Sequence, residues 1–229
     1  MIDNLHFQTI LQRLPQFNHL TAETQQAIST AAIHRRLSAG KVIYLEGEPA
    51  DYIYILESGW VKATRMTRNG REQAMMFLRP VEVFGDIAVF TGNPYPGTVT
   101  ALEDVSLWAI PANIVLDLVQ KQPGFALSVI RHLGHRVLHY INLVEDLSLR
   151  SVEERLANTL LAHAELRGDE LIVPRRDWAT YDQMAVRLGT VRDVLSRALR
   201  TLEAEGLLKV EKQAILLVDP KGLAERADR

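Results

Sequence analysis

The sequence predicts an α+β protein: an N-terminal β-roll of the jelly-roll type, joined by a long dimerisation helix to a C-terminal winged helix-turn-helix. Three observations predict this class. Short strand-like runs fill the first half, with turn signals about every eight to twelve residues, as in β-sandwiches and rolls. A heptad pattern follows, and then two short helical patterns precede two further strands. We therefore expect three parts, residues 1–123, 124–148 and 149–229.

The first part is expected to begin with helices and to continue as strands. Helical character extends from about Asp3 to Ile33, and Thr21 caps one of these helices. From Leu37 onward short apolar or alternating runs indicate strands, and Asn69-Gly70 is the best hairpin turn because both residues tolerate positive φ. The expected strands are residues 41–45, 52–56, 61–66, 73–78, 98–102 and 105–110.

A long helix is expected from Pro123-Gly124 to about Leu147. β-Branched residues at one heptad position and mostly leucine at the other favour a parallel two-stranded coiled coil, and therefore a homodimer. A helix that packs on its own β-roll is the alternative. The predicted dimer interface consists of Ile130, Leu133, Val137, Tyr140, Val144 and Leu147.

The segment after residue 179 carries the clearest local signals. Thr180 and Gln183 stand three apart, as a capping box at a helix start requires, and Gly189 suits a left-handed exit from that helix. Thr190 then opens a second predicted helix, with Asp193 at its third position. The apolar face of this helix consists of Val191, Val194, Leu195, Ala198, Leu199 and Leu202.

Two expected strands, residues 207–210 and 214–218, follow this pair of helices. A helix-turn-helix followed by a hairpin is a winged DNA-binding unit. The polar face of the second helix is rich in arginine, whose guanidinium can hydrogen-bond the O6 and N7 of guanine. The candidate DNA-binding residues are Thr180, Thr190, Arg192, Asp193, Ser196, Arg197 and Arg200. An ordinary helical hairpin with a solvated charged face is the alternative.

The charge balance restricts where DNA could bind. The chain has a formal net charge of −2, which gives no global attraction to nucleic acid. Between Arg175 and Arg200, however, six arginines stand against three aspartates. Any DNA footprint is therefore local to this segment.

Residue usage excludes several classes of site. The chain has no cysteine, which excludes disulfides, thiolate nucleophiles, thiolate-ligated haem and cysteine-held iron–sulfur clusters. No histidine lies between Arg35 and Arg131, so a metal-dependent enzyme inside the barrel would lack ligands. We therefore expect neither an enzyme nor a metal site. No membrane-spanning run or signal-peptide pattern occurs, and a cytoplasmic protein is expected.

Several short motifs occur in an order that resembles a known family. They are Ala39–Ile43, Glu46–Ala50, Ser58–Lys62, Phe84–Asp86, Glu154–Ala157 and Asp193–Arg197. Together they resemble the CRP/FNR family of bacterial transcription regulators across nearly the whole chain. The last motif is closer to the FNR branch, with Asp193 where glutamate is usual. The resemblance implies a cyclic-nucleotide-binding-like β-roll and a homodimer that binds a near-palindromic promoter site, contacts RNA polymerase and activates, or sometimes represses, transcription.

The resemblance also assigns roles to residues of the helix-turn-helix. It implies that Thr180 contacts a phosphate. The implied base readers are Arg192, Asp193, Ser196 and Arg197. The short side chain of Asp193 leaves two roles open, a base contact or a helix cap that also positions Arg197.

An effector pocket between the β-roll and the long helix is implied as well. Cyclic-nucleotide members hold the cyclic phosphate with a glutamate and an Arg-Ser pair, whereas Asp86 and Pro96-Gly97 stand here. A buried phosphate would lack its guanidinium partner, and so cyclic AMP is not the expected effector. The expected pocket residues are Phe84, Gly85, Asp86, Tyr95, Thr98, Leu133, Val137 and Tyr140.

The cofactor is left open. Haem would require His132, His135 or His139, for which a solvated helix face is the alternative; three further histidines, His6, His19 and His34, are expected at the surface. A sensor of peroxide, nitric oxide or a metabolite, or a regulator without an effector, also fits. A ligand-binding regulatory module that does not bind DNA is the rival class. Salt-dependent binding of promoter DNA separates the two classes.

Overall fold

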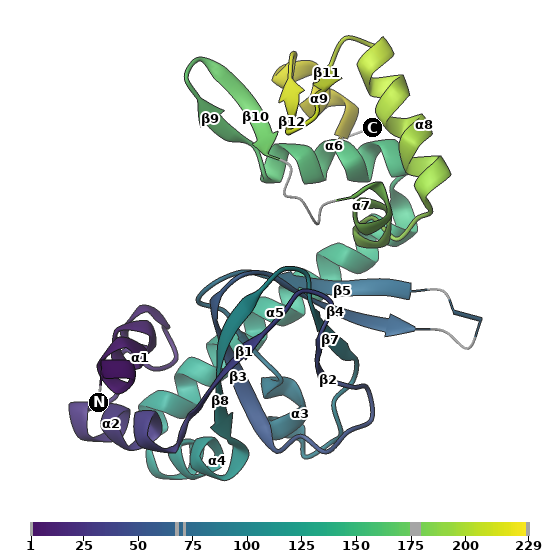
Figure 1. The fold of residues 1–229 in the computed structure, drawn as a ribbon. Helices are drawn as coiled ribbons and strands as arrows, with labels where there is room; N and C mark the ends of the chain where they lie inside the picture. Colours follow the sequence, from purple (N-terminus) through teal and green to yellow (C-terminus); the bar gives the residue numbers. More distant parts are fainter. Residues whose placement is uncertain (1, 67–68, 71, 175–179, 228–229) are drawn as a thin grey trace. The chain divides into compact units, whose positions relative to one another are not determined.

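The computed structural model describes residues 2–66, 69–70, 72–174 and 180–227 (Figure 1). The side chains of residues 2–4, 139, 142, 143 and 147 lie outside the described part. Contacts divide the chain into two compact units, residues 1–139 and 140–229, so that the division falls within helix α5 (Pro123–Leu149). Each unit has hydrophobic core clusters of its own.

Two helices open the first unit, α1 (Ile2–Arg13) and α2 (Ala22–Ala31). Thr21 caps α2 as predicted, because its Oγ1 accepts a hydrogen bond from the Thr24 amide at 3.3 Å. Helical structure ends before the predicted limit, since Ile33 begins strand β1 (Ile33–Leu37). This strand escaped prediction because its mostly exposed side chains show no apolar alternation.

Two four-stranded antiparallel sheets form the β-roll, with strand orders β1-β8-β3-β6 and β2-β7-β4-β5. The other strands are β2 (Val42–Tyr44), β3 (Tyr52–Ser58), β4 (Val61–Met66), β5 (Glu72–Leu78), β6 (Val83–Phe84), β7 (Thr98–Ala101) and β8 (Val105–Pro111). All six predicted strands are present, and β4 pairs with β5 across the predicted turn at Asn69-Gly70. The predicted fold class is confirmed.

Aromatic side chains fill the space between the two sheets. Tyr44 stacks on Tyr95 with 3.7 Å between ring centroids, and Tyr54 stacks on Phe84 at 5.2 Å. Tyr44 of β2 also stacks on Tyr54 of β3 with 5.5 Å between ring centroids, and this contact joins the two sheets.

A second core lies on the outer face of the β1-β8-β3-β6 sheet, beneath helices (Figure 1). Residues of α1, α2, α4 (Ala112–Lys121) and the start of α5 contribute to it. Phe7 of α1 stacks on Trp108 of β8 at 4.3 Å. The first half of the long helix is thereby packed against its own β-roll, through Phe125 and Val129.

The second unit contains the predicted winged helix-turn-helix. Its helices are α6 (Val152–Ala162), α7 (Tyr181–Arg187), α8 (Arg192–Ala204) and α9 (Pro220–Ala227). Its antiparallel sheet has the order β11-β12-β10-β9, with β9 (Glu165–Arg167), β10 (Glu170–Pro174), β11 (Leu208–Val210) and β12 (Ala214–Leu217). The wing strands β11 and β12 confirm the prediction, whereas the β9–β10 hairpin and α9 are additional. In the described ranges, no helix has the length and apolar character that a membrane crossing requires.

Candidate nucleic-acid interface and effector pocket

Helix α7 begins at the predicted capping residue. The Oγ1 of Thr180 accepts a hydrogen bond from the Gln183 amide at 3.3 Å. The reciprocal half of the capping box is not formed, since Gln183 Oε1 is buried without a hydrogen-bond partner in the part of the chain that the structure describes. The cap leaves Thr180 exposed at the surface of the second unit.

The turn between α7 and α8 corrects one prediction. Gly189 has a φ of 63°, the expected left-handed exit. Thr190 does not open α8, because its amide donates to the Ala185 carbonyl at 2.9 Å and so closes the preceding helix. Val191 takes the N-cap position and α8 begins at Arg192. Val191 is therefore 56% exposed rather than part of the buried face.

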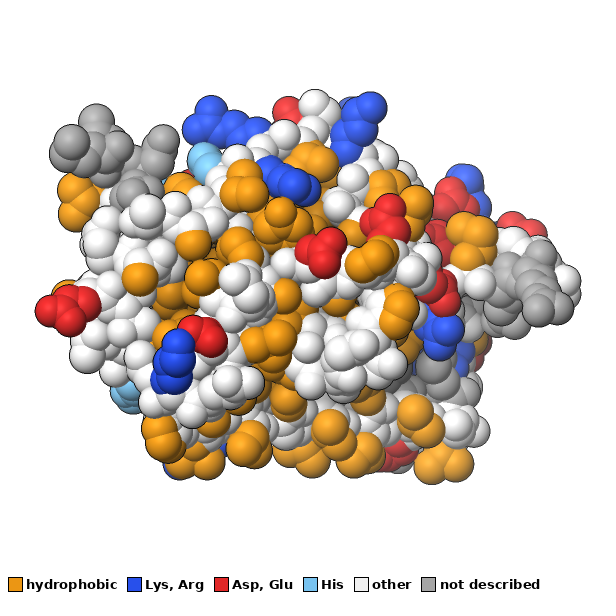
Figure 2. Space-filling view, turned by 90° about the horizontal axis from the view of Figure 1, so that it is seen from below, with side chains coloured by type: hydrophobic (Ala, Val, Ile, Leu, Met, Phe, Trp, Pro, Cys, Tyr) orange, Lys and Arg blue, Asp and Glu red, His pale blue; other side chains and the backbone are white. Residues whose placement is uncertain are grey.

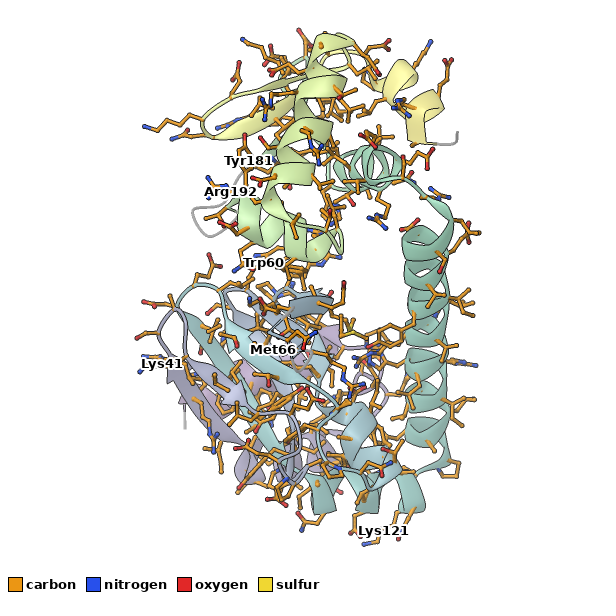
Figure 3. The ribbon with its side chains drawn as sticks, turned by 90° about the vertical axis from the view of Figure 1, so that its right-hand side faces the viewer. Lys41, Trp60, Met66, Lys121, Tyr181 and Arg192 are labelled. Carbon is orange, nitrogen blue, oxygen red and sulfur yellow. The ribbon has the colours of Figure 1, made fainter. Side chains whose placement is uncertain are left out.

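Helix α8 has a buried and an exposed face, and Figure 3 labels Arg192 at its start. Leu195, Leu199 and Leu202 are buried in the core of the second unit. The exposed residues are Arg192, Asp193, Arg197 and Arg200, and Ser196 is half-buried. This division follows helical spacing as the sequence predicts.

The charged groups on the exposed face have few partners within the chain. Nη1 of Arg192 lies 3.4 Å from Oδ2 of Asp182, an exposed ion pair that contributes little stability. Arg200 donates to the backbone and hydroxyl of Ser196. Over the described ranges Asp193 forms no ion pair with Arg197, so the suggested positioning role is not seen. The guanidinium groups are thus available to an outside partner.

The wing fixes the other end of α8. Leu208 of β11 pairs with Leu217 of β12, and Oε1 of Glu203 accepts a hydrogen bond from the Val210 amide at 2.9 Å. The core therefore holds one face of α8 and the wing holds its C-terminal end. The N-terminal half of α8 keeps its polar face exposed.

Asp86, one of the expected pocket residues, forms a buried ion pair. Asp86 is 2% exposed at the start of α3 (Asp86–Thr91), and its Oδ1 lies 2.5 Å from Nη1 of Arg136 on α5. Nε2 of His132 lies 3.2 Å from the other carboxylate oxygen. Burial by itself raises the pKa of Asp86, but His132 and Arg136 lower it more, so the net pKa is below the ordinary value.

Arg136 is a site residue that the sequence reasoning missed. The signal was present, because Phe125, Val129 and Leu133 lie on the α5 face that packs on the first unit and Arg136 continues that face. Its Nη2 also lies 3.0 Å from the sulfur of Met76 on β5. The expected pocket thus already contains a guanidinium, supplied by the helix rather than by the β-roll.

The other expected pocket residues are not all brought together. Phe84 and Tyr95 are buried between the sheets, and Gly85 lies against the Tyr95 ring. The Tyr95 hydroxyl donates to the Tyr52 carbonyl at 2.6 Å, and burial raises its pKa, so the hydroxyl remains protonated. Thr98 accepts a hydrogen bond from the Glu46 amide at 3.1 Å. The three expected pocket residues on α5 do not share one environment. Leu133 packs on the helical core, Val137 is exposed and Tyr140 belongs to the second unit.

Gly97 lies close to the backbone of β4 at Thr64. A Cβ at Gly97 would lie 2.8 Å from the Thr64 carbonyl oxygen, which is closer than real side chains approach. A serine at this position would force the strands apart. The expectation that the effector is not cyclic AMP stays a prediction.

Comparisons with known proteins match both units. A model of the cyclic nucleotide-binding domain matches residues 34–122, and a model of the Crp-like helix-turn-helix domain matches residues 154–226. A CRP-like cAMP-activated global transcriptional regulator of Mycobacterium tuberculosis is 27% identical over 191 residues, covering 82% of this chain and 85% of the relative. This chain belongs to the CRP/FNR family of transcription regulators.

Solved structures of the CRP/FNR fold agree with the architecture. FixK2 from Bradyrhizobium japonicum has a TM-score of 0.74 at 22% identity, covering 85% of this chain and 96% of that structure. A CRP/FNR-family transcriptional regulator from Thermus thermophilus has a TM-score of 0.68 at 24% identity, covering 86% and 99%. The resemblance stated from motifs is confirmed for the family, which is non-enzymatic and uses a DNA-binding helix-turn-helix. Membership of the FNR branch stays a prediction.

Helix α5 of this CRP/FNR chain carries an exposed apolar stripe. Ile130, Val137 and Val144, one of the two predicted heptad positions, are 64%, 57% and 63% exposed. Further exposed apolar residues on α5 are Leu127, Leu138, Ile141 and Leu149. Figure 2 shows hydrophobic side chains gathered on the face it draws, including a row along the lower edge.

The second predicted heptad position behaves differently. Leu133 packs on the core of its own unit, as the alternative reading of the long helix expected. Tyr140 is half-buried, and the Leu147 side chain lies outside the described residues. The exposed stripe runs instead through Leu127, Ile130, Val137, Ile141 and Val144, because the neighbouring face of α5 is already used by the β-roll.

Within the described part of the chain, no cluster of three or more side chains is arranged to hold a metal. His135 is exposed, and the side chain of His139 is not described. His34 differs from the surface position expected for it, since it is half-buried and contacts Glu57.

Proposed function

We propose that this protein is a homodimeric, sequence-specific DNA-binding transcription regulator, acting mainly as an activator in the cytoplasm. The observation that carries the proposal is the exposed arginine face at the start of α8, supported from behind by a buried leucine face. An exposed face rich in guanidinium groups, on the second helix of a helix-turn-helix, suits the edge of guanine in the major groove. Contact with RNA polymerase follows from the family resemblance.

In this proposal Arg192 and Arg197 bind base edges, because both are exposed and neither is held in a strong ion pair. Arg200 lies farther along the helix and contacts a phosphate. Thr180 donates its hydroxyl to a phosphate beside α7, which fixes the orientation of the unit without reading sequence. Asp193 lies beside Arg192 and accepts from cytosine where the groove brings that base close.

A second copy of this chain is the proposed occupant of the α5 stripe. The stripe is apolar, follows steps of three and four residues and is exposed in the single chain, as the seam of a two-stranded coiled coil would be. Two recognition helices then bind half-sites of a near-palindrome about one DNA turn apart. The domain limits 1–123, 124–148 and 149–229 belong to this proposal, with α5 as the connecting element.

The proposed switch is an effector other than cyclic AMP that acts at Asp86 and Arg136. Arg136 lies on the helix that also carries the dimer stripe, so an effector that competes for either charged group changes how α5 packs. The effector can shift α5 between two packing arrangements only by as much free energy as its affinities for those two arrangements differ.

The test uses fluorescence anisotropy with promoter fragments from the host genome and a duplex of random sequence. We expect saturable binding that weakens steeply as salt rises, because phosphate contacts release counterions. Arg192→Ala combined with Arg197→Ala is expected to remove the preference for any promoter fragment. Lys221→Ala is the matched control, since Lys221 is an exposed cation on α9 of the same unit. A wild-type chain that ignores duplex DNA at low salt contradicts the proposal and favours the rival class.

A further inference from the structure

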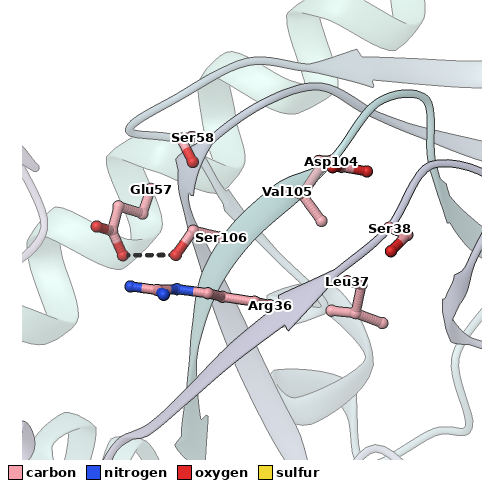
Figure 4. Close-up of a pocket in the computed structure, with 8 residues that line it drawn as sticks. All are labelled: Arg36, Leu37, Ser38, Glu57, Ser58, Asp104, Val105 and Ser106. Atoms are coloured by element: carbon pink, nitrogen blue, oxygen red, sulfur yellow. Dashed lines mark hydrogen bonds between the residues drawn. The ribbon is translucent and has the colours of Figure 1, made fainter.

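Two histidines of this chain contact partners of opposite charge, His34 in the first unit and His163 in the second. Nε2 of His34 lies 2.8 Å from Oε2 of Glu57, at a β-bulge in β3. Figure 4 shows that Glu57 also accepts a hydrogen bond from the Ser106 hydroxyl. Burial raises the pKa of Glu57, but hydrogen bonds from Ser106 and His6 lower it more, so Glu57 is ionised at neutral pH. A carboxylate only accepts, so Nε2 of His34 carries a hydrogen, and protonation of this ring keeps the contact.

His163 has the opposite arrangement. It is the C-cap of α6, and its Nδ1 lies 2.8 Å from the Thr159 carbonyl oxygen, in the last turn of that helix. Its Nε2 lies 2.5 Å from Nη2 of Arg187, at the end of α7. A guanidinium only donates, so Nε2 of His163 is an acceptor without a hydrogen, and a carbonyl only accepts, so Nδ1 carries the hydrogen. These two partners together require a neutral His163 ring in the Nδ1–H form.

The contact between His163 and Arg187 links α6 to α7. Helix α7 has seven residues and is too short to be stable alone, so its position depends on packing. Ala185 and Leu188 bury one side of α7 in the core of the second unit. Burial lowers the pKa of Arg187, but the guanidinium stays charged, and a charge in this position must keep its acceptors. The ring of His163 supplies one of them.

A proton on Nε2 of His163 removes this link. The residue is exposed, so solvent protons reach it. A doubly protonated ring cannot accept from Arg187 and faces it as a second cation. The C-terminal end of α6 favours a positive ring, but it acts through a partial charge, whereas Arg187 brings a full charge to hydrogen-bond distance. The arginine therefore decides the outcome.

Most other charged groups of the surrounding elements are placed elsewhere. Glu154 closes the capping box at the opposite end of α6, and Asp182 of α7 pairs with Arg192. Arg155 donates to the Asp146 carbonyl. The remaining described charges are Glu153 on α6, Glu165 and Arg167 on β9, Asp193, Arg197, Arg200 and Glu203 on α8, and Lys221, Glu225 and Arg226 on α9. The group that contacts the His163 ring from α7 is Arg187.

We propose that His163 is a positioning residue that holds α7 through Arg187 while neutral and releases it on protonation, which weakens DNA binding. The effect on DNA rests on the proposed function, whereas the ring form and the link to folding do not. Unfolding frees Nε2 to take up a proton, so the unfolded chain binds more protons and stability of the second unit falls as pH falls through the histidine range. His163 is the only histidine among residues 140–229, so no other histidine of that unit contributes.

The first test determines the ring form directly. Long-range proton–nitrogen NMR spectra of the full chain distinguish the two neutral forms of an imidazole and the doubly protonated form. The His163 signals are identified by their absence from the His163→Gln variant. We expect the Nδ1–H form at about pH 7.5. An Nε2–H ring, or a doubly protonated ring, at this pH overturns the proposal.

Two substitutions separate the link from the charge. His163→Gln keeps an acceptor that reaches Arg187 at every pH, whereas the shorter side chain of His163→Asn does not reach it. Urea unfolding is followed by the amide signals of residues 180–227. From about pH 7.5 to about pH 5.5 the folded-to-unfolded ratio of wild type should fall about tenfold, as expected for one hydrogen bond to a charged group. His163→Gln should change little, and His163→Asn should resemble acidified wild type throughout.

DNA binding is measured on the same preparations at constant salt. Relative to His163→Gln, wild type should lose about tenfold in affinity for a promoter fragment over the same pH range. His19→Gln is the matched control, since it removes an exposed histidine of the first unit, and it should follow wild type. Equal pH profiles for wild type and His163→Gln overturn the proposal. A chain with the expected ring form and pH-dependent stability, but without DNA binding, supports the link to α7 and contradicts the proposed function.

Discussion

The exposed face of α8 and the buried pair of Asp86 with Arg136 both depend on arginine guanidinium groups, but these groups are exposed in the first region and buried in the second. On α8 the arginines are exposed and weakly paired, so a partner can reach them. In the first unit the guanidinium of Arg136 is held by a carboxylate that is 2% exposed. An exposed charge is available for recognition at little cost, whereas a buried charge must keep its partner or destabilise the fold. The comparison predicts that similar substitutions act on binding in one region and on stability in the other.

The largest expected effect is on the stability of the first unit. Asp86→Ala leaves Arg136 buried without its counter-charge and is expected to lower the free energy of unfolding by about 3–5 kcal/mol. Urea denaturation followed by tryptophan fluorescence measures the change. The double substitution Asp86→Ala with Arg136→Met removes both charges and should recover part of the loss. A loss below about 1 kcal/mol, or strictly additive effects, would mean that the two groups are not coupled.

The next effect concerns the α5 stripe. Val137→Glu places a charge in the proposed seam and should raise the dimer dissociation constant at least about 100-fold, because the carboxylate would be desolvated. Sedimentation equilibrium gives the constant. Arg131→Glu, an exposed charge change on the same helix, serves as control. If both variants dimerise like the wild type, the seam lies elsewhere.

Loss of one base contact should be smaller. Arg192→Ala is expected to weaken the preferred site by about 1–3 kcal/mol while hardly changing binding to random DNA, so that base preference relaxes at one position. Anisotropy titrations with single-base variants of the site provide the measurement. A uniform loss across all sequences would assign Arg192 to the phosphates instead.

Thr180→Ala should produce the opposite pattern at lower amplitude. Removal of the hydroxyl is expected to weaken all duplexes equally, by about 1 kcal/mol, because a phosphate contact carries no sequence information. The same substitution also removes the α7 cap, so thermal unfolding must accompany the titrations. A loss confined to one operator sequence would contradict this assignment.

The smallest effect is on the pH dependence of stability. The folded-state pKa of Asp86 is below its unfolded value, so its contribution is fully present above the unfolded pKa and is lost as pH falls through the folded pKa. Wild type should therefore lose stability relative to Asp86→Asn only below about pH 4. Urea denaturation at a series of pH values gives the difference. If wild type instead gains stability relative to Asp86→Asn as pH falls, the pKa of Asp86 is not lowered on folding.

The sequence predicted elements whose signals are local. The Thr180 cap, the buried leucines of α8 and the Asn69-Gly70 hairpin follow from spacing and turn chemistry, and the structure has them all. Predictions failed where tertiary context decided. Thr190 resembles the N-cap of α8, but its amide donates a hydrogen bond to the Ala185 carbonyl at the end of α7, and Val191 takes the N-cap position.

Long-range partners were the other source of failure. β1 is a strand because it pairs with β8. Its mostly exposed residues show no local pattern that would predict this pairing. Arg136 becomes a pocket residue only when the helix lies on the roll, 50 residues beyond its partner Asp86. Glu57 draws its contacts from α1, β1 and β8, and its role depends on a bulge that spacing alone does not reveal.

The most direct test of the central claim is selection of bound duplexes from a random DNA pool by the purified full chain, followed by sequencing. We predict enrichment of an inverted repeat whose half-site centres lie about 10 base pairs apart, and loss of one conserved base pair per half-site with Arg192→Ala. Enrichment of a single unrepeated motif, or no enrichment at low salt, would contradict recognition by two α8 surfaces in one dimer.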